Sequence, residues 1–125
     1  MTPIRILLVD DNSAYRRHLA RLLAREQDFQ VVGEAADGAE AIARARELRP
    51  DVVLMDFRME GLDGFSAARA IVRDLPAAKV FILTAFPGAL DPEKVARGGI
   101  HGLLTKDRPA ADLVGTIRAS VLPRA

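Results

Sequence analysis

Val52-Val53-Leu54-Met55-Asp56 is the stretch that decides the fold: an uninterrupted apolar run that ends on a single carboxylate. Such a run is typical of a β-strand covered on both faces, as parallel strands are in α/β proteins. Ligands of these sheets gather at the carboxyl ends of the strands. The carboxylate after this strand is therefore a helix cap, a solvated loop residue or a residue that takes part in chemistry, and the stretch alone does not decide between them.

The composition is that of one ordinary globular domain. The chain has 125 residues, half of them hydrophobic and 28% charged, which is enough to bury a core. It has no cysteine, which excludes disulfides and thiolate metal sites, and its net charge of +1 does not indicate a nucleic-acid surface. No apolar stretch is long enough to span a membrane and no signal peptide opens the chain, so we expect a cytoplasmic protein without a membrane partner.

Strand-like and helix-like segments alternate along the chain. Apolar runs predict strands over about residues 4–9, 29–33, 52–55, 79–83 and 102–104. Helical spacing of apolar residues, with capping residues and prolines, predicts helices over about residues 13–26, 38–48, 63–74, 91–97 and 109–121. The first of these helices presents Tyr15, Leu19, Leu22 and Leu23 on one face. The alternation predicts a single α/β domain over residues 1–125, with a doubly wound sheet of five parallel strands.

Polar residues follow four of these strands. They are Asp10 and Asp11, Asp56, Thr84, and Lys106. Because parallel strands end at one edge of the sheet, we expect these five side chains to lie close together. Three carboxylates about 4 Å apart repel by roughly 4 kcal/mol per pair at an effective dielectric of about 20, so the site should hold a cation. Oxygen ligands without Cys or His favour Mg²⁺, and a carboxylate beside Mg²⁺, a lysine and a hydroxyl suits phosphoryl transfer to Asp56.

Four motifs carry a family resemblance. They are Leu7-Leu8-Val9-Asp10-Asp11, Val53-Leu54-Met55-Asp56 with Met59, Gly61 and Asp63-Gly64 after it, Ile82-Leu83-Thr84-Ala85, and Leu104-Thr105-Lys106. In this order they resemble the receiver domain of bacterial two-component response regulators, over the whole chain. Val32-Gly33-Glu34-Ala35 with Asp37-Gly38, and Lys106-Asp107, are most similar to receivers that precede a LuxR-type helix-turn-helix. The resemblance implies a flavodoxin-like (βα)5 fold with strand order 2-1-3-4-5.

The resemblance also implies a phosphoacceptor and a metal site. Asp56 would accept a phosphoryl group from the phosphohistidine of a sensor histidine kinase. Asp11 and Asp56 would bind Mg²⁺ directly, together with the backbone carbonyl of Arg58, and Asp10 would act through water. The chain would then be a regulator and not an enzyme, promoting only its own phosphorylation and dephosphorylation.

A phosphoryl-binding set and a switch follow from the same resemblance. Lys106 and the hydroxyl of Thr84 would bind the phosphoryl oxygens, with the backbone amides of Arg58 and Ala85. Thr84 is also a switch position, which in many receivers works with a tyrosine or phenylalanine three residues before the lysine. Here that second switch position is Leu103.

Leu103 leads to two hypotheses. In the first, the signal passes through the loop after Thr84 and the segment from Asp91 to Val121 without an aromatic rotamer change. In the second, the chain is a receiver-like interaction module that works without phosphorylation. Two other departures, Glu60 where a proline is frequent and Phe86 two residues after Thr84, predict an altered lifetime of the phosphoryl group.

The partners follow from the family as well. The resemblance implies a sensor histidine kinase and a phosphorylation-dependent homodimer, formed through the last two helices and the fifth strand. DNA binding would belong to an output domain outside these 125 residues, and Leu122-Pro123 would begin a linker toward it. A Mg²⁺-dependent phosphatase for small molecules uses similar chemistry, but the chain has no cap domain and no second acid two residues after Asp56.

Overall fold

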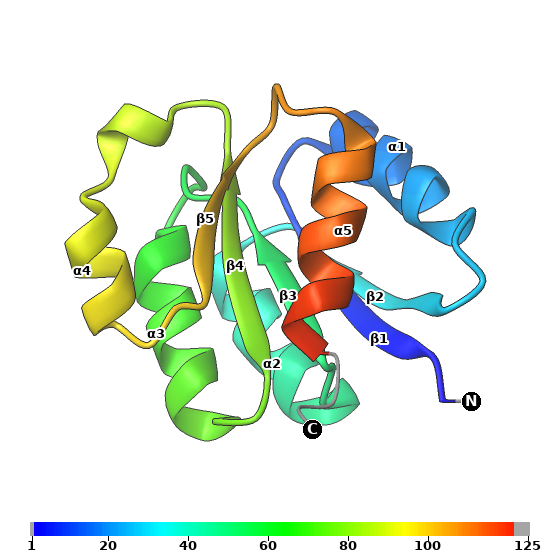
Figure 1. Ribbon diagram of the computed structural model, residues 1–125. Coiled ribbons are helices and arrows are strands. Elements are labelled where there is room, and N and C mark those ends of the chain that lie inside the picture. The colour runs from blue at the N-terminus through cyan, green and yellow to red at the C-terminus, as the bar shows by residue number, and fades with distance from the viewer. Residues whose placement is uncertain (1, 122–125) are drawn as a thin grey trace.

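Five parallel strands form one sheet in the computed structural model, which describes residues 2–121 (Figure 1). The strands are β1 (Ile4–Val9), β2 (Phe29–Ala35), β3 (Val52–Met55), β4 (Lys79–Thr84) and β5 (Gly102–Thr105). The helices are α1 (Ser13–Ala24), α2 (Gly38–Leu48), α3 (Gly64–Asp74), α4 (Pro92–Arg97) and α5 (Ala110–Val121). The strand order β2-β1-β3-β4-β5 confirms the predicted flavodoxin-like, doubly wound fold. The expected linker residues Leu122 and Pro123 lie outside the described residues.

Three strands extend beyond their predicted ends. β2 continues to Ala35 because it stays paired with β1 up to Val9, after a register shift between Ile6 and Leu7. β4 includes Thr84 and β5 includes Thr105, and these two residues are partners in the ladder. Strand pairing thus holds Thr84, and Thr105 directly before Lys106, at the edge of the sheet.

Helix ends also differ by one or two residues. Asp63, predicted as the first residue of its helix, is the N-cap of α3, and Asp91, predicted as a capping residue, is the N-cap of α4. In both cases the carboxylate accepts a hydrogen bond from a backbone N–H of the first turn. α1 ends at Ala24 and not at residue 26, because the backbone N–H of Arg25 already turns back to the carbonyls of Leu22 and Leu23. α5 starts at residue 110 and not at 109, and a short 3-10 helix, η1 (Pro87–Ala89), precedes α4 without having been predicted.

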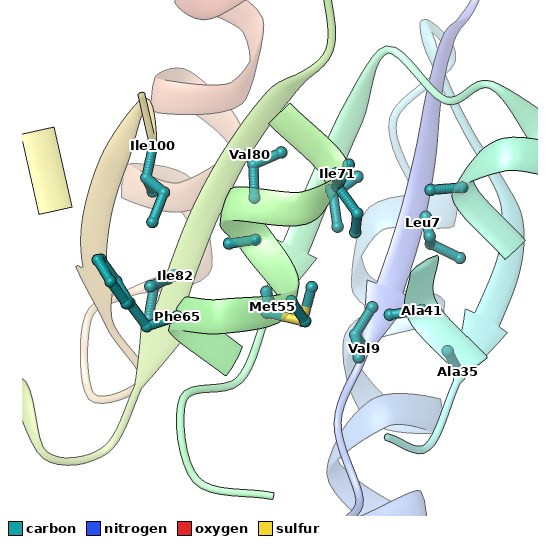
Figure 2. Close-up of a cluster of buried hydrophobic side chains, with 14 of the residues drawn as sticks. Leu7, Val9, Ala35, Ala41, Met55, Phe65, Ile71, Val80, Ile82 and Ile100 are labelled. Atoms are coloured by element: carbon teal, nitrogen blue, oxygen red, sulfur yellow. The ribbon is translucent and has the colours of Figure 1, made fainter. Parts of the chain in front are cut away.

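Two hydrophobic clusters, one on each face of the sheet, hold the helices in place. Alternate residues of β1, β3 and β4 point to opposite faces, so Leu7 and Val9 belong to one cluster and Ile6 and Leu8 to the other. The first cluster packs on α2, α3 and α4 through Ala41, Ala45, Phe65, Ala67, Ala68, Ile71 and Val95, several of which Figure 2 shows against the strands. The second packs on α1 and α5 through Leu19, Leu23, Leu113 and Ile117.

The central strand β3 is buried along its whole length, as its apolar sequence predicted. Full burial of one such aliphatic side chain contributes roughly 1.5–3 kcal/mol. Because helices cover both faces of the sheet, the polar side chains of the central strands lie at or just after the strand ends. Within residues 2–121, no helix combines the length and the apolar character needed to cross a membrane.

Candidate functional site

Two neighbouring strands bring the acidic residues together. Val9 and Met55 are partners in the ladder between β1 and β3, so Asp10 and Asp56 leave the sheet side by side. The backbone N–H of Asp56 donates to the carbonyl of Val9 at 2.9 Å, which continues the ladder past the last strand residue. Carboxylate oxygens of Asp10, Asp11 and Asp56 all lie within 4.8 Å of one another. Asp10 and Asp56 are buried, at 4% and 8% exposure, and Asp11 is exposed.

Lys106, which directly follows β5, lies against this acidic cluster at the same edge of the sheet. Its Nζ donates to Oδ2 of Asp10 at 2.6 Å and lies 3.5 Å from Oδ1 of Asp56. The backbone N–H of Lys106 donates to the carbonyl of Thr84 at 2.9 Å, which fixes where the lysine leaves β5. Asp10 is therefore the stronger partner of the lysine, and its Oδ1 also accepts from the backbone N–H of Asn12.

The electrostatics of the cluster are those of a site with excess negative charge. Burial, followed by repulsion from Asp10, raises the pKa of Asp56 from 3.8 to about 6, although the ammonium of Lys106 opposes this. A cation would relieve this repulsion between carboxylates. The donors are all oxygens, two of them buried and one facing solvent, and they fit Mg²⁺, which retains some of its waters. Asp11 is the carboxylate that solvent reaches, so it is placed to bind an entering ion.

Thr84 ends β4 at the same edge of the sheet. Its side chain is buried, at 1% exposure, and its Oγ1 accepts a hydrogen bond from the backbone N–H of Phe86 at 3.1 Å. Phe86 itself is 55% exposed, and the guanidinium carbon of Arg58 lies 4.6 Å from the centre of its ring. The loops that follow β3 and β4 therefore touch through this pair. Ala85, between Thr84 and Phe86, is exposed.

A glycine allows the chain to return close to Asp56. Gly64 is the first residue of α3, is buried, and donates its N–H to the carbonyl of Phe57 at 2.9 Å. A Cβ at this position would lie 1.9 Å from the carbonyl oxygen of Asp56. No residue with a side chain fits there without moving the backbone that carries Asp56. Gly64 thus contributes to the site by being small.

The structure brings together most, but not all, of the predicted site residues. Asp10, Asp11, Asp56 and Lys106 form one cluster, and Thr84 shares their edge of the sheet. Leu103 lies apart, half-buried in β5 and packed against the core cluster on the side of α2, α3 and α4. The individual roles of these residues, including the backbone roles of Arg58 and Ala85, stay predictions.

Sequence reasoning missed two residues of this region. Tyr15 was assigned only to the inner face of the first helix, yet its ring centre lies 4.3 Å from Nζ of Lys106. The guanidinium of Arg16 donates to the backbone carbonyl of Asp10 and, at 2.7 Å, to Oε1 of Glu34. One signal was available: Tyr15 is the only tyrosine in the chain and lies one helical turn after Asp11.

The fold and this acidic edge with its lysine define the receiver class of signalling domains. The family profile of the response regulator receiver domain matches residues 6–118, and the chain belongs to this family. It is 42% identical to the transcriptional regulatory protein LiaR of Bacillus subtilis over 94% of this chain and 56% of that protein. It is 39% identical to the response regulator protein VraR of Staphylococcus aureus over 92% of this chain and 55% of that protein. The chain thus spans about half the length of these relatives.

Solved structures show the same similarity. A LuxR-family two-component response regulator from Aurantimonas sp. SI85-9A1 is 38% identical, with a TM-score of 0.88 over 94% of this chain and 84% of that one. The response regulator domain of Thermotoga maritima CheB is 31% identical, with a TM-score of 0.86 over 97% of this chain and 99% of that one. The predicted family, and its likeness to receivers of LuxR-type regulators, are confirmed.

Proposed function

We propose that this chain accepts a phosphoryl group on Asp56 from the phosphohistidine of a sensor histidine kinase, in a reaction that requires Mg²⁺. One observation carries the proposal. The carboxylate of Asp56 lies in a cluster of three acids whose oxygens are within 4.8 Å of one another, and 3.5 Å from the ammonium of Lys106. This combination can bind a divalent cation and a phosphoryl group at once.

The residues of the chain would share the chemistry as follows. An oxygen of Asp56 forms the new bond to phosphorus while the bond from phosphorus to the kinase histidine breaks, which gives an acyl phosphate. The ammonium of Lys106 leaves Asp10 for a phosphoryl oxygen, and the hydroxyl of Thr84 donates to another. Asp11, Asp56 and the carbonyl of Arg58 would hold Mg²⁺, with Asp10 acting through water, and the ion would supply positive charge to offset the phosphoryl oxygens. The amides of Arg58 and Ala85 complete the set.

The output would be a change in the surface formed by α4, β5 and α5. Thr84 is the origin of this change, because its hydroxyl accepts from the N–H of Phe86, so a movement of the hydroxyl toward a phosphoryl oxygen would shift the loop that begins there. The loop through η1 to α4 starts at this point. Leu103 is packed against the core, which supports a path through this loop instead of an aromatic rotamer change. Backbone chemical shifts from Ala85 to Val121 that stay unchanged on phosphorylation would contradict this path.

The chain would serve as the regulatory part of a cytoplasmic transcription regulator. The transcriptional regulatory protein at 42% identity and the LuxR-family structure at 38% support a LuxR-type DNA-binding output domain in the complete protein. Phosphorylation would then favour a homodimer through the α4, β5 and α5 surface. DNA binding would belong to the output domain and not to these 125 residues.

Intact mass spectrometry tests the proposal directly. The wild type and Asp56→Asn are incubated with Mg²⁺ and a small phosphodonor, and we expect one added phosphoryl group in the wild type alone. A wild type that gains none, with its kinase as well as with the small donor, would contradict the proposal. Turnover of simple phosphate esters by the same sample would instead indicate a small-molecule phosphatase.

A second candidate is a receiver-like module that binds partners without phosphorylation. Leu103 favours this candidate, because the switch position is taken by an aliphatic side chain packed against the core, and there is no aromatic side chain whose rotamer could change. Partner affinity measured with and without the phosphoryl group separates the two candidates. Equal affinities would favour the phosphorylation-independent module.

A further inference from the structure

Lys106 lies between the acidic cluster and an aromatic ring. On one side its Nζ is 2.6 Å from Oδ2 of Asp10 and 3.5 Å from Oδ1 of Asp56. On the other side its Nζ is 4.3 Å from the ring centre of Tyr15. The side chain of Lys106 is only 17% exposed, so the ring takes the place of water around the ammonium.

This contact is attractive because the face of a tyrosine ring carries partial negative charge. The attraction is stronger where water is excluded, as it is here. Burial and the charges of Asp10 and Asp56 raise the pKa of Tyr15 to about 12, so its hydroxyl stays protonated at neutral pH. The ring therefore acts on Lys106 by its face, without a charge of its own.

We propose that Tyr15 is a positioning residue for Lys106: its ring holds the ammonium beside Asp10 in the free protein and loses this contact when the lysine moves to a phosphoryl group on Asp56. The first half of this inference concerns the free protein only. The second half rests on the proposed function, since it requires a phosphoryl group at Asp56.

The surroundings of Tyr15 leave room for such a change. A cavity of about 220 Å³ lies beside the ring, and its wall includes Lys106, Leu103, Leu113 and Thr116. Two of these residues belong to α5 and one to β5, which are parts of the proposed output surface. A Tyr15 ring released by Lys106 can move into this space.

The contact can be measured before any phosphodonor is added. Protons above the face of an aromatic ring are shielded, so the ε-methylene protons of Lys106 should resonate upfield of those of Lys79. We expect this shift to persist in Tyr15→Phe, which keeps the ring, and to vanish in Tyr15→Leu. Lys106 protons without the upfield shift in the wild type, or with the same shift in Tyr15→Leu, would overturn the positioning role.

The kinetic consequence separates positioning from a structural effect. The rate of phosphorylation by the small phosphodonor should rise about fivefold in Tyr15→Leu, because Lys106 no longer has to give up the contact with the ring, and should stay within about twofold of the wild type in Tyr15→Phe. Phe29→Leu is the matched control, because Phe29 also lies under a cation, with the guanidinium carbon of Arg118 5.2 Å from its ring centre, but at the start of β2. Phe29→Leu should also stay within about twofold. A Tyr15→Leu rate equal to that of the wild type would overturn the proposal.

The second half is tested by the same spectrum with Mg²⁺ and beryllofluoride, a mimic of the phosphoryl group. We expect the upfield shift of Lys106 to be lost in the wild type when the mimic binds, and to remain in Asp56→Asn under the same conditions. A shift that persists with the mimic bound to the wild type would overturn the release of Tyr15. Failure of Asp56 to gain a phosphoryl group would contradict the proposed function, while the ring-current shift of the free protein would still decide the first half.

Discussion

Replacement of Gly64 by alanine should damage the site without touching any polar atom in it. The new Cβ would lie 1.9 Å from the carbonyl oxygen of Asp56 and 2.8 Å from both the carbonyl carbon of Asp56 and Cα of Phe57. These are backbone atoms, which cannot turn aside as the end of a side chain does. The peptide between Asp56 and Phe57 would have to move by about 1.5 Å to restore ordinary contact.

The magnitude follows from the packing around this peptide. Overpacking of a buried position costs about 1–3 kcal/mol and occasionally more. Gly64 also donates its N–H to the carbonyl of Phe57, and that hydrogen bond, worth about 1 kcal/mol, would be strained by the same movement. We therefore expect Gly64→Ala to lower the free energy of unfolding by about 2–4 kcal/mol.

Gly115→Ala is the matched control. Gly115 lies in the middle of α5, and a Cβ there would meet no atom within 4 Å. Alanine is the better helix former, so this variant should gain about 0.5–1 kcal/mol. Urea unfolding of the three proteins, followed by circular dichroism, measures both changes.

Mg²⁺ affinity provides the link to the site. A displaced Asp56 should weaken Mg²⁺ binding in Gly64→Ala, in the fraction that is folded, and leave it unchanged in Gly115→Ala. If Gly64→Ala unfolded at the same urea concentration as the wild type and bound Mg²⁺ as well, the close approach of α3 to Asp56 would be refuted.

Three further predictions concern the phosphoryl group and the pH dependence of stability. Phe86→Ala removes a half-exposed ring that stacks on Arg58, and should speed hydrolysis of the acyl phosphate about fivefold by admitting water; a lifetime equal to that of the wild type, measured by intact mass, would contradict this. The hydrogen bond from Arg118 lowers the pKa of Asp28 below 3.8, so its stabilising contribution is present above pH 3.8 and is lost as the pH falls through the lowered pKa. Asp28→Asn should therefore flatten the acid limb of the stability curve, and thermal unfolding between about pH 2 and 5 tests it. Burial raises the pKa of Asp56 to about 6, so the metal-free protein should lose stability as the pH rises from about 4 through 6. At pH 7, Asp56→Asn should therefore have a free energy of unfolding about 1–3 kcal/mol higher than the wild type, and a higher urea midpoint. An unchanged urea midpoint would contradict the repulsion between the carboxylates.

The order of elements and the edge of the sheet that carries the site could be predicted from the sequence. An uninterrupted apolar run such as Val52 to Met55 requires cover on both faces, and the alternation of strands and helices supplies it. In a parallel sheet, residues that directly follow the strands must share one edge. For this reason Asp10, Asp56 and Lys106 could be expected together although Lys106 and Asp10 are 96 residues apart.

Tertiary structure alone decided which atoms meet within that edge. Sequence periodicity predicts that Tyr15 faces inward, but only the packing of α1 against the sheet, on the same face as α5, puts its ring on Lys106. Likewise, the motif places Gly64 at a helix start, whereas the 1.9 Å approach to Asp56 depends on the path of the loop between them. The physical reason is the range of the interactions: strand and helix patterns arise from residues near in sequence, whereas these contacts are set by how separately formed elements pack against one sheet.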